Sequence, residues 1–221
     1  QAQELGNRAL VYCGQGGVCS ATTRLNAALI EEGADGVDRT TSELPDLENY
    51  RLLFVMAPRL GLTTEGRAAL VQWHNAGGLL VLVGEFVDWA REANRSLNTL
   101  LGELGYPELS LGTSGRTIAE GCNNRGQVNQ HPLTEGVEVV KVAGATLTSG
   151  GDVLVTSGAD IATTQGRVVL AGDTNMFTDS CDAFLNDENI RFFRNLWNWT
   201  GGVEPMDRDG DGVGNEGDNC P

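Results

Sequence analysis

The sequence predicts a three-layer α/β sandwich, in which a mostly parallel sheet lies between two layers of helices. Two observations predict it. Short apolar runs bounded by glycine alternate with stretches whose apolar residues recur at helical spacing, which is the βαβ pattern of a parallel sheet. The run Leu79–Val83 (LLVLV) is apolar at every position, as expected of a strand covered on both faces. The chain has 221 residues, 40% hydrophobic and 20% charged, which is enough for one large domain.

The first hundred residues supply the alternating elements. Ser20 can cap a helix that runs to Glu32, and Thr63-Thr64-Glu65 opens a second helix that Gly77-Gly78 closes. A third helix is expected over Trp89–Leu104. The strands between these helices are expected at Arg8–Cys13, Val37–Thr40, Arg51–Met56 and Leu79–Val83.

From Glu108 onward the pattern changes to short alternating stretches, which are typical of hairpins added antiparallel at one edge of the sheet. Arg167–Ala171 (RVVLA) is again a buried strand, and Asp187–Trp199 is an amphipathic helix that Gly201-Gly202 is expected to end. The hairpin strands are expected at Glu108–Leu111, Thr117–Ala119, Val137–Val142, Ala145–Thr148 and Val153–Thr156.

Charge and hydropathy exclude some classes of partner. Fifteen Lys and Arg against 30 Asp and Glu give a net charge of −15. This balance argues against binding to nucleic acid or to anionic lipid and favours cations. No apolar run approaches the ~18–20 residues that a membrane span needs. We therefore expect neither a nucleic-acid partner nor membrane insertion.

The acidic tail forms a second unit, residues 203–221, after an α/β domain at residues 1–202. Counted from Asp207, positions one, three, five, nine and twelve carry oxygen donors, and position six is glycine. This is the EF-hand-type arrangement for calcium, although position twelve is Asp rather than Glu. The alternative is a flexible acidic linker, whose carboxylates would repel one another without a cation. We predict Ca²⁺ bound by Asp207, Asp209, Asp211, the Val213 carbonyl, Asn215 and Asp218.

The continuation Asp218-Asn219-Cys220-Pro221 makes this motif resemble one thrombospondin type 3 repeat, an extracellular calcium-binding module. In that family the repeats occur in tandem, and the cysteine bonds to a cysteine of another repeat. This chain holds one such repeat, so Cys220 would pair beyond Pro221. The start at Gln1 and the stop inside the motif lead us to expect a processed piece of a longer secreted polypeptide.

Three further stretches resemble the class I glutamine amidotransferase-like superfamily, whose flavodoxin-like domains include the ThuA-like branch. They are Gly77–Gly84, His131–Gly136, and Gly166–Asp173 with the closing helix 189–199. An active amidotransferase has a nucleophilic cysteine at the elbow after the strand and a His–Glu pair later. Here the elbow reads Gly84-Glu85-Phe86, and no His-x-Glu follows. We therefore expect no thiol-dependent amide hydrolysis and no enzyme activity of that class.

The cysteines indicate an oxidising compartment. None lies in a CxxC, and the two histidines have no ligand-like neighbours, so disulfides are favoured over a zinc site. The local pairing is Cys13 with Cys19, which leaves Cys122 with Cys181, although four cysteines allow three pairings. Free buried thiols are the alternative.

Other candidate sites have ordinary structural explanations. The glycine-rich loop Gly14–Cys19 lies where a dinucleotide fingerprint would be, but Cys19 takes the place of its third glycine. Glu85, Asp173 and Asp179 follow strands, where open α/β sheets place ligands, yet acids there routinely cap turns and helices. His131 before Pro132 is expected to be a turn residue, and the sequons at Asn94 and Asn198 are short matches that arise by chance.

These observations favour a secreted, non-catalytic calcium-binding protein with a binding or structural role at the cell surface or in extracellular matrix. Its partners would be calcium and other surface proteins. One alternative is a carbohydrate hydrolase that acts through Glu85 and Asp173. Another is a subunit that self-associates into a calcium-stabilised extracellular polymer.

Overall fold

The computed structural model describes residues 5–17, 21–114, 124–179 and 187–202. Within them, nine strands form one sheet in the order β2-β1-β3-β4-β11-β10-β9-β6-β7. Neighbouring strands are parallel from β2 to β11 and antiparallel from β11 to β7. The strands are β1 (Arg8–Tyr12), β2 (Gly36–Thr40), β3 (Tyr50–Met56), β4 (Leu79–Val83), β5 (Ser110–Leu111), β6 (Asn124–Val128), β7 (Val139–Val142), β8 (Thr148–Ser149), β9 (Asp152–Thr156), β10 (Asp160–Gln165) and β11 (Val168–Ala171).

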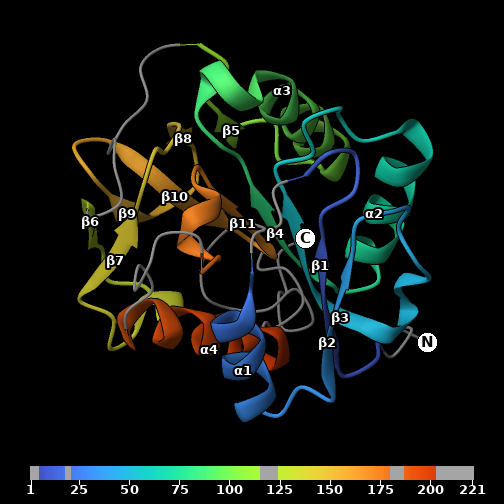
Figure 1. Ribbon diagram of the computed structural model, residues 1–221, viewed down its shortest axis with the longest axis horizontal. Coiled ribbons are helices and arrows are strands. Elements are labelled where there is room, and N and C mark those ends of the chain that lie inside the picture. The colour runs from blue at the N-terminus through green and yellow to red at the C-terminus, as the bar shows by residue number, and fades with distance from the viewer. Residues whose placement is uncertain (1–4, 18–20, 115–123, 180–186, 203–221) are drawn as a thin grey trace, which may run out of the picture.

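Helices cover both faces of this sheet, so the expected three-layer α/β sandwich is confirmed (Figure 1). Helices α1 (Thr23–Glu31) and α4 (Asp187–Gly202) lie on one face, and α2 (Thr64–Asn75) and α3 (Val87–Leu104) lie on the other. Three short 3₁₀ turns are η1 (Leu47–Asn49), η2 (Pro132–Thr134) and η3 (Thr174–Met176).

The parallel strands β1, β3, β4 and β11 each contribute to two cores because their side chains alternate between the faces. In β3, Phe54 is buried with α1 and α4, whereas its neighbour Val55 is buried with α2 and α3. The same alternation holds in β4, where all five side chains are inaccessible to solvent. This double burial explains why β4 is apolar at every position, whereas the edge strand β2, which is not buried, carries Asp38 and Arg39.

The structure corrects the prediction in the second half of the chain. Glu108–Leu111 and Ala145–Thr148 were expected to join the sheet edge, but β5 and β8 are two-residue strands that pair with each other in a separate sheet. Strands β6 and β10 were not expected, because Asn124–Val128 and Asp160–Gln165 are largely polar. Helix α4 continues through Gly202 instead of ending before Gly201. Thr117–Ala119 lies outside the described residues.

The first helix begins at Thr23, and its expected cap Ser20 lies outside the described residues. The side chain of Thr22 makes no capping hydrogen bond. Instead, Oδ2 of Asp179 accepts a hydrogen bond of 2.8 Å from the backbone N–H of Thr23. A residue distant in sequence therefore takes over the cap, which a local motif cannot reveal.

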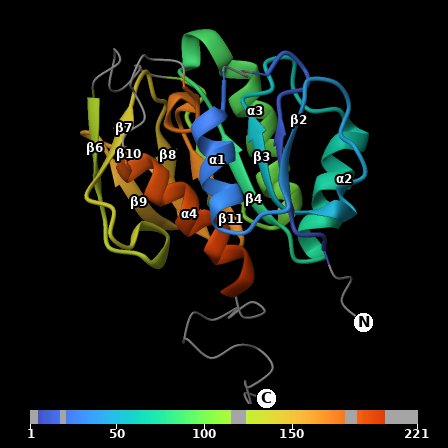
Figure 2. The ribbon, with the colours of Figure 1, turned by 60° about the horizontal axis from the view of Figure 1, so that its bottom comes forward.

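The parallel strands all point toward one edge of the molecule, the carboxyl edge, which lies at the top of Figure 2. Helix α4 runs in the opposite direction and ends at the bottom of that view. The loops after β1, β3, β4 and β11 therefore converge at the carboxyl edge, where open α/β sheets bind ligands.

Candidate functional site

A pair of buried carboxyl groups lies at the carboxyl edge, after two adjacent strands. Glu85 follows β4 and Asp173 follows β11, and these strands pair directly. Their side chains are 3% and 0% exposed. The sequence thus placed both acids correctly at strand ends, and the sheet order brings them together.

The chain itself satisfies every carboxyl oxygen of this pair. Oε1 of Glu85 accepts a hydrogen bond of 2.9 Å from the N–H of Phe86, and Oε2 accepts from the hydroxyl and the N–H of Thr174. Oδ1 of Asp173 accepts a bond of 2.8 Å from the N–H of Asn175, and Oδ2 accepts from the N–H of Ala143. The pair therefore connects the loop after β4, the 3₁₀ turn η3 and the segment after β7.

Burial makes both carboxyl groups hard to ionise. Desolvation raises the pKa of Glu85 to about 7, although its hydrogen bonds act in the opposite direction. Desolvation raises the pKa of Asp173 well above its usual value, and the charge of Glu85 raises it further. Because two buried like charges repel each other, the pair retains a proton in conditions where exposed acids are ionised.

The interpretation of these acids as caps is confirmed for two of the three. The Asp173 side chain caps η3 through its bond to Asn175, and Asp179 caps α1 through Thr23. Glu85 is bonded to its own loop and to Thr174 rather than capping a long helix.

An exposed apolar and basic surface lies beside this buried pair. The ring of Phe86 is stacked on Trp89, with ring centroids 5.8 Å apart and planes at 15°, and the guanidinium carbon of Arg59 is 4.6 Å from the centroid of Trp89. Leu60 is 77% exposed and shares a hollow of about 450 Å³ with Arg59, Trp89 and Arg91. We call Arg59, Leu60, Phe86, Trp89 and Arg91 the edge platform.

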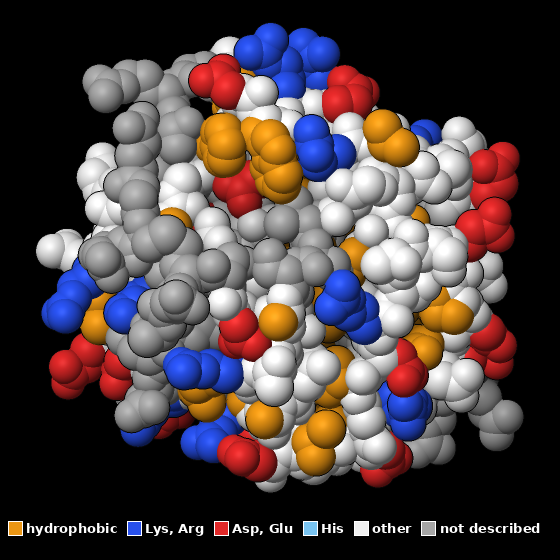
Figure 3. All heavy atoms as spheres, in the orientation of Figure 1, with side chains coloured by type: hydrophobic (Ala, Val, Ile, Leu, Met, Phe, Trp, Pro, Cys, Tyr) orange, Lys and Arg blue, Asp and Glu red, His pale blue; other side chains and the backbone are white. Residues whose placement is uncertain are grey.

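Figure 3 shows hydrophobic and basic side chains gathered side by side in the region where α3 lies in Figure 1. Sequence reasoning missed this surface, because its residues come from the loop after β3, the loop after β4 and the start of α3. The available signal was the pair of large apolar residues in positions just after strands, Leu60 after β3 and Trp89 after β4. Neither continues the hydrophobic pattern of a core-facing helix.

Backbone contacts hold the loops of the edge platform together. The N–H of Leu60 donates a hydrogen bond of 2.8 Å to the carbonyl of Gln15, which joins the loop after β3 to the loop after β1. Gln15 has φ of 57°, a left-handed conformation that is uncommon for a residue other than glycine. At Gly17 an added Cβ would lie 2.6 Å from the carbonyl oxygen of Met56, so the two loops approach too closely for a side chain.

The described part of this glycine-rich loop is therefore used for close packing against the end of β3. Cys13 at its start is disulfide-bonded. Cys19, Cys122 and Cys181 lie outside the described residues, so the expected pairings Cys13–Cys19 and Cys122–Cys181 stay predictions.

The side chain of Asn94 links the elbow Gly84–Phe86 to the segment at Gly112. Its side-chain amide donates to the carbonyls of Glu85 and Gly112 at 2.8 Å, and its Oδ1 accepts from the N–H of Glu85 at 3.1 Å. The residue is inaccessible to solvent. The sequon at Asn94 is thus buried in the folded chain and has a structural role.

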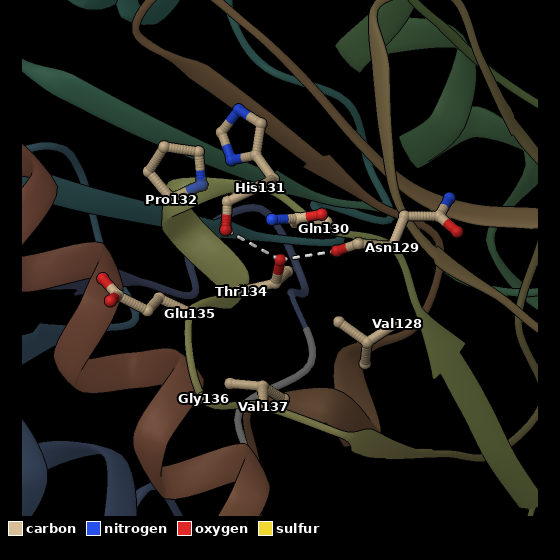
Figure 4. Close-up of a pocket in the computed structure, with 9 residues that line it drawn as sticks. All are labelled: Val128, Asn129, Gln130, His131, Pro132, Thr134, Glu135, Gly136 and Val137. Atoms are coloured by element: carbon tan, nitrogen blue, oxygen red, sulfur yellow. Dashed lines mark hydrogen bonds between the residues drawn. The ribbon is translucent and has the colours of Figure 1, made fainter.

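The hollow of about 610 Å³ beside η2 lies on the antiparallel side of the sheet, and Figure 4 shows its lining. The ring of His131 points away from Val128 and Val137, and Nδ1 accepts a hydrogen bond of 3.0 Å from the N–H of Leu133. The hydroxyl of Thr134 donates to the carbonyl of Asn129 at 2.6 Å. Burial lowers the pKa of His131. The turn interpretation of His131 is confirmed, and these polar groups are used within the turn.

The predicted calcium ligands Asp207, Asp209, Asp211, Val213, Asn215 and Asp218 all lie outside the described residues. In the part of the chain that the structure describes, no group of three or more His, Cys, Asp or Glu side chains could hold a metal ion. No helix in this part is long and apolar enough to cross a membrane.

Comparison with known proteins shows the fold but no family. No family model matches the sequence, and no curated protein matches it. A structure described as the mmIFT52 N-terminal domain superposes with a TM-score of 0.67 at 15% identity, covering 86% of this chain and 99% of that one. The cytoplasmic protein STM1381 from Salmonella typhimurium LT2 gives 0.66 at 13% identity, covering 87% and 99%.

A thua-like protein from Parabacteroides merdae aligns over 91% of this chain and 92% of its own, with a TM-score of 0.49 and 16% identity. At their identities the mmIFT52 and STM1381 matches show a shared α/β fold alone. The resemblance to the amidotransferase-like superfamily and its ThuA-like branch, like that to a thrombospondin repeat, stays a prediction. This chain is similar to several solved α/β domains in its fold.

Proposed function

We propose that this chain is a secreted, non-catalytic calcium-binding protein with a binding or structural role at the cell surface or in extracellular matrix. The non-catalytic part of the proposal rests on the burial and the hydrogen bonding of the Glu85 and Asp173 carboxyl groups. All four of their carboxyl oxygens accept hydrogen bonds from the chain, and both side chains are buried. A general acid or base must come within hydrogen-bond reach of its substrate.

The binding part of this proposal rests on the edge platform, which lies where α/β sheets present ligand sites. Its aromatic, aliphatic and arginine side chains are the types that dominate binding energy at protein surfaces. The calcium part and the extracellular location rest on the motif Asp207–Asp218 and on the cysteines.

The alternative enzyme would be a carbohydrate hydrolase, and one observation favours it. Glu85 has a pKa of about 7, and a carboxyl group kept protonated near neutral pH is what a general acid requires. However, glycosidases place their two carboxyl groups on either side of the scissile bond, and this pair is enclosed and bonded to backbone amides.

An assay of nitrophenyl glycosides and soluble polysaccharides between pH 4 and 8 separates the two classes. We expect no turnover above that of Glu85→Gln, since the enclosed carboxyl groups reach no substrate. Glu65→Gln, which removes an exposed acid from the first turn of α2, controls for the lost charge. Turnover that is lost in both Glu85→Gln and Asp173→Asn but kept in Glu65→Gln would refute the non-catalytic proposal.

A further inference from the structure

The edge platform is a preformed surface rather than a set of loose side chains. Phe86 and Arg59 both lie against the ring of Trp89, so the ring is fixed while 37% of the residue remains exposed. Next to it, the N–H of Leu62 donates a bond of 2.7 Å to the hydroxyl of Ser96 in α3, which fixes the loop that carries Leu60. Little conformational entropy is left to lose when a partner binds.

The apolar part of the edge platform is exposed and has no partner among the residues that the structure describes. Among the described residues, four large hydrophobic side chains are markedly exposed: Ile30, Leu60, Trp89 and Leu147. Two of these four, Leu60 and Trp89, line the same hollow. Exposed apolar groups that share one hollow form a contact surface, whereas single ones are ordinary.

The charges around the hollow favour an anionic partner. Arg59 and Arg91 form no ion pair with any residue that the structure describes. The hollow also holds two acids. Oε2 of Glu92 lies 3.6 Å from Nη1 of Arg95, whereas Asp88 forms no ion pair among the described residues, so two arginines without an ion-pair partner face one such acid. Two guanidinium groups are thus available in a chain whose net charge is −15.

The geometry also argues against a sugar ring as the occupant. Stacking of a ring on Trp89 needs a bare aromatic face, and the guanidinium of Arg59 already lies over that ring. A partner can instead pair a carboxylate with Arg59 or Arg91 and place an apolar side chain against Leu60 and the edge of Trp89.

We infer that the edge platform binds a segment of another protein in which a carboxylate stands beside an aliphatic or aromatic side chain. This inference deepens the proposed function and rests on its binding part. A second copy of this chain is a poor occupant, because two molecules of charge −15 repel each other. The chain's own acidic stretch follows α4, which ends at the opposite edge from the platform (Figure 2).

Selection from a random dodecapeptide phage library against the intact chain tests this inference, at physiological ionic strength with calcium present. We expect enriched peptides to carry Asp or Glu within two positions of Leu, Ile, Phe or Trp. In fluorescence anisotropy, the synthetic peptide should bind at least about tenfold more weakly to the double variant R59A/R91A and to Leu60→Ser. Replacing its acid by the amide should weaken it similarly.

The matched control is Arg125→Ala, which removes an exposed arginine of β6 and should leave the peptide affinity unchanged. Circular dichroism checks that each variant is folded. Enrichment of neutral or basic peptides, absence of enrichment, or equal binding to R59A/R91A would overturn the inference. So would sedimentation showing dimers of the parent chain that R59A/R91A abolishes, since the occupant would then be a second copy. Calcium binding involves no platform residue, so failure here leaves that part of the proposed function intact.

Discussion

Glu85 and Asp173 show how burial decides what a residue can do. In sequence they resemble candidate catalytic acids, because both follow buried strands at the ligand-binding edge of the sheet. In the folded chain their oxygens accept hydrogen bonds from four different residues, and their pKa values are raised mainly by desolvation. The result is a buried pair that joins three loops, one of which carries Phe86 of the edge platform.

This pair should make the protein less stable as the pH rises. The folded-state pKa of Glu85, about 7, lies above the ordinary value of 4.5, so the folded state holds a proton that the unfolded state has released. The contribution of Glu85 to the free energy of unfolding is therefore fully present below pH 4.5 and is lost as the pH rises through 7. The loss amounts to at most about 3 kcal/mol. Urea unfolding at several pH values measures it.

In Glu85→Gln the free energy of unfolding should fall less between pH 5 and 8 than in the parent. In the double variant that also carries Asp173→Asn, this fall should be smaller still. Glu65→Gln, which changes the charge at an exposed position, should keep the parent's slope. An unchanged pH dependence in the double variant would contradict the assignment of raised pKa values.

At the scale of elements, the sequence predicted the strands whose hydrophobic pattern is local, and it missed features that depend on residues distant in the chain. The central strands of the parallel half were recognised because burial on both faces makes them rich in apolar residues, as in Leu79–Val83. Strand β10 was missed because its buried positions include Thr163 and Thr164, which interrupt the hydrophobic signal. The cap of α1 by Asp179 was missed because the two residues are 156 positions apart.

The candidate site was predictable only in part for the same reason. The position of Glu85 and Asp173 after strands is local information, but their burial depends on the sheet order, which places β4 beside β11. The edge platform joins Arg59 in the loop after β3 to Trp89 at the start of α3, and no spacing in the sequence encodes that contact.

Asn94 in α3 should prove essential for the shape of the carboxyl edge. Asn94→Ala removes the side chain that bonds the N–H and the carbonyl of Glu85, and it leaves the carbonyl of Gly112 with only the hydroxyl of Thr146 at 3.2 Å as a donor. Since unsatisfied buried polar groups are costly, we expect a loss of about 2–4 kcal/mol in the free energy of unfolding. Chemical denaturation measures it.

The control is Asn75→Ala at the exposed end of α2, which should change stability by less than about 0.5 kcal/mol. Equal, small effects of the two substitutions would show that the Asn94 network does not hold the elbow.

At the scale of the whole molecule, we expect the carboxyl edge of the sheet and the opposite edge to have different functions. The carboxyl edge carries the buried acid pair and the edge platform. The opposite edge is where α4 ends, and the acidic stretch with the calcium motif follows it in sequence. A partner at one edge and a calcium-stabilised segment after the other would suit a binding or structural protein outside the cell.

Isothermal titration calorimetry of the intact chain with calcium tests the central claim most directly, because the proposed calcium site at Asp207–Asp218 and the proposed extracellular role both rest on calcium binding. We predict saturable binding at one site, lost in Asp209→Ala and kept in Glu65→Ala. Light scattering of the same samples shows whether calcium also drives self-association. A flat titration of the unmutated chain, or equal heats from the parent and Asp209→Ala, would contradict the account.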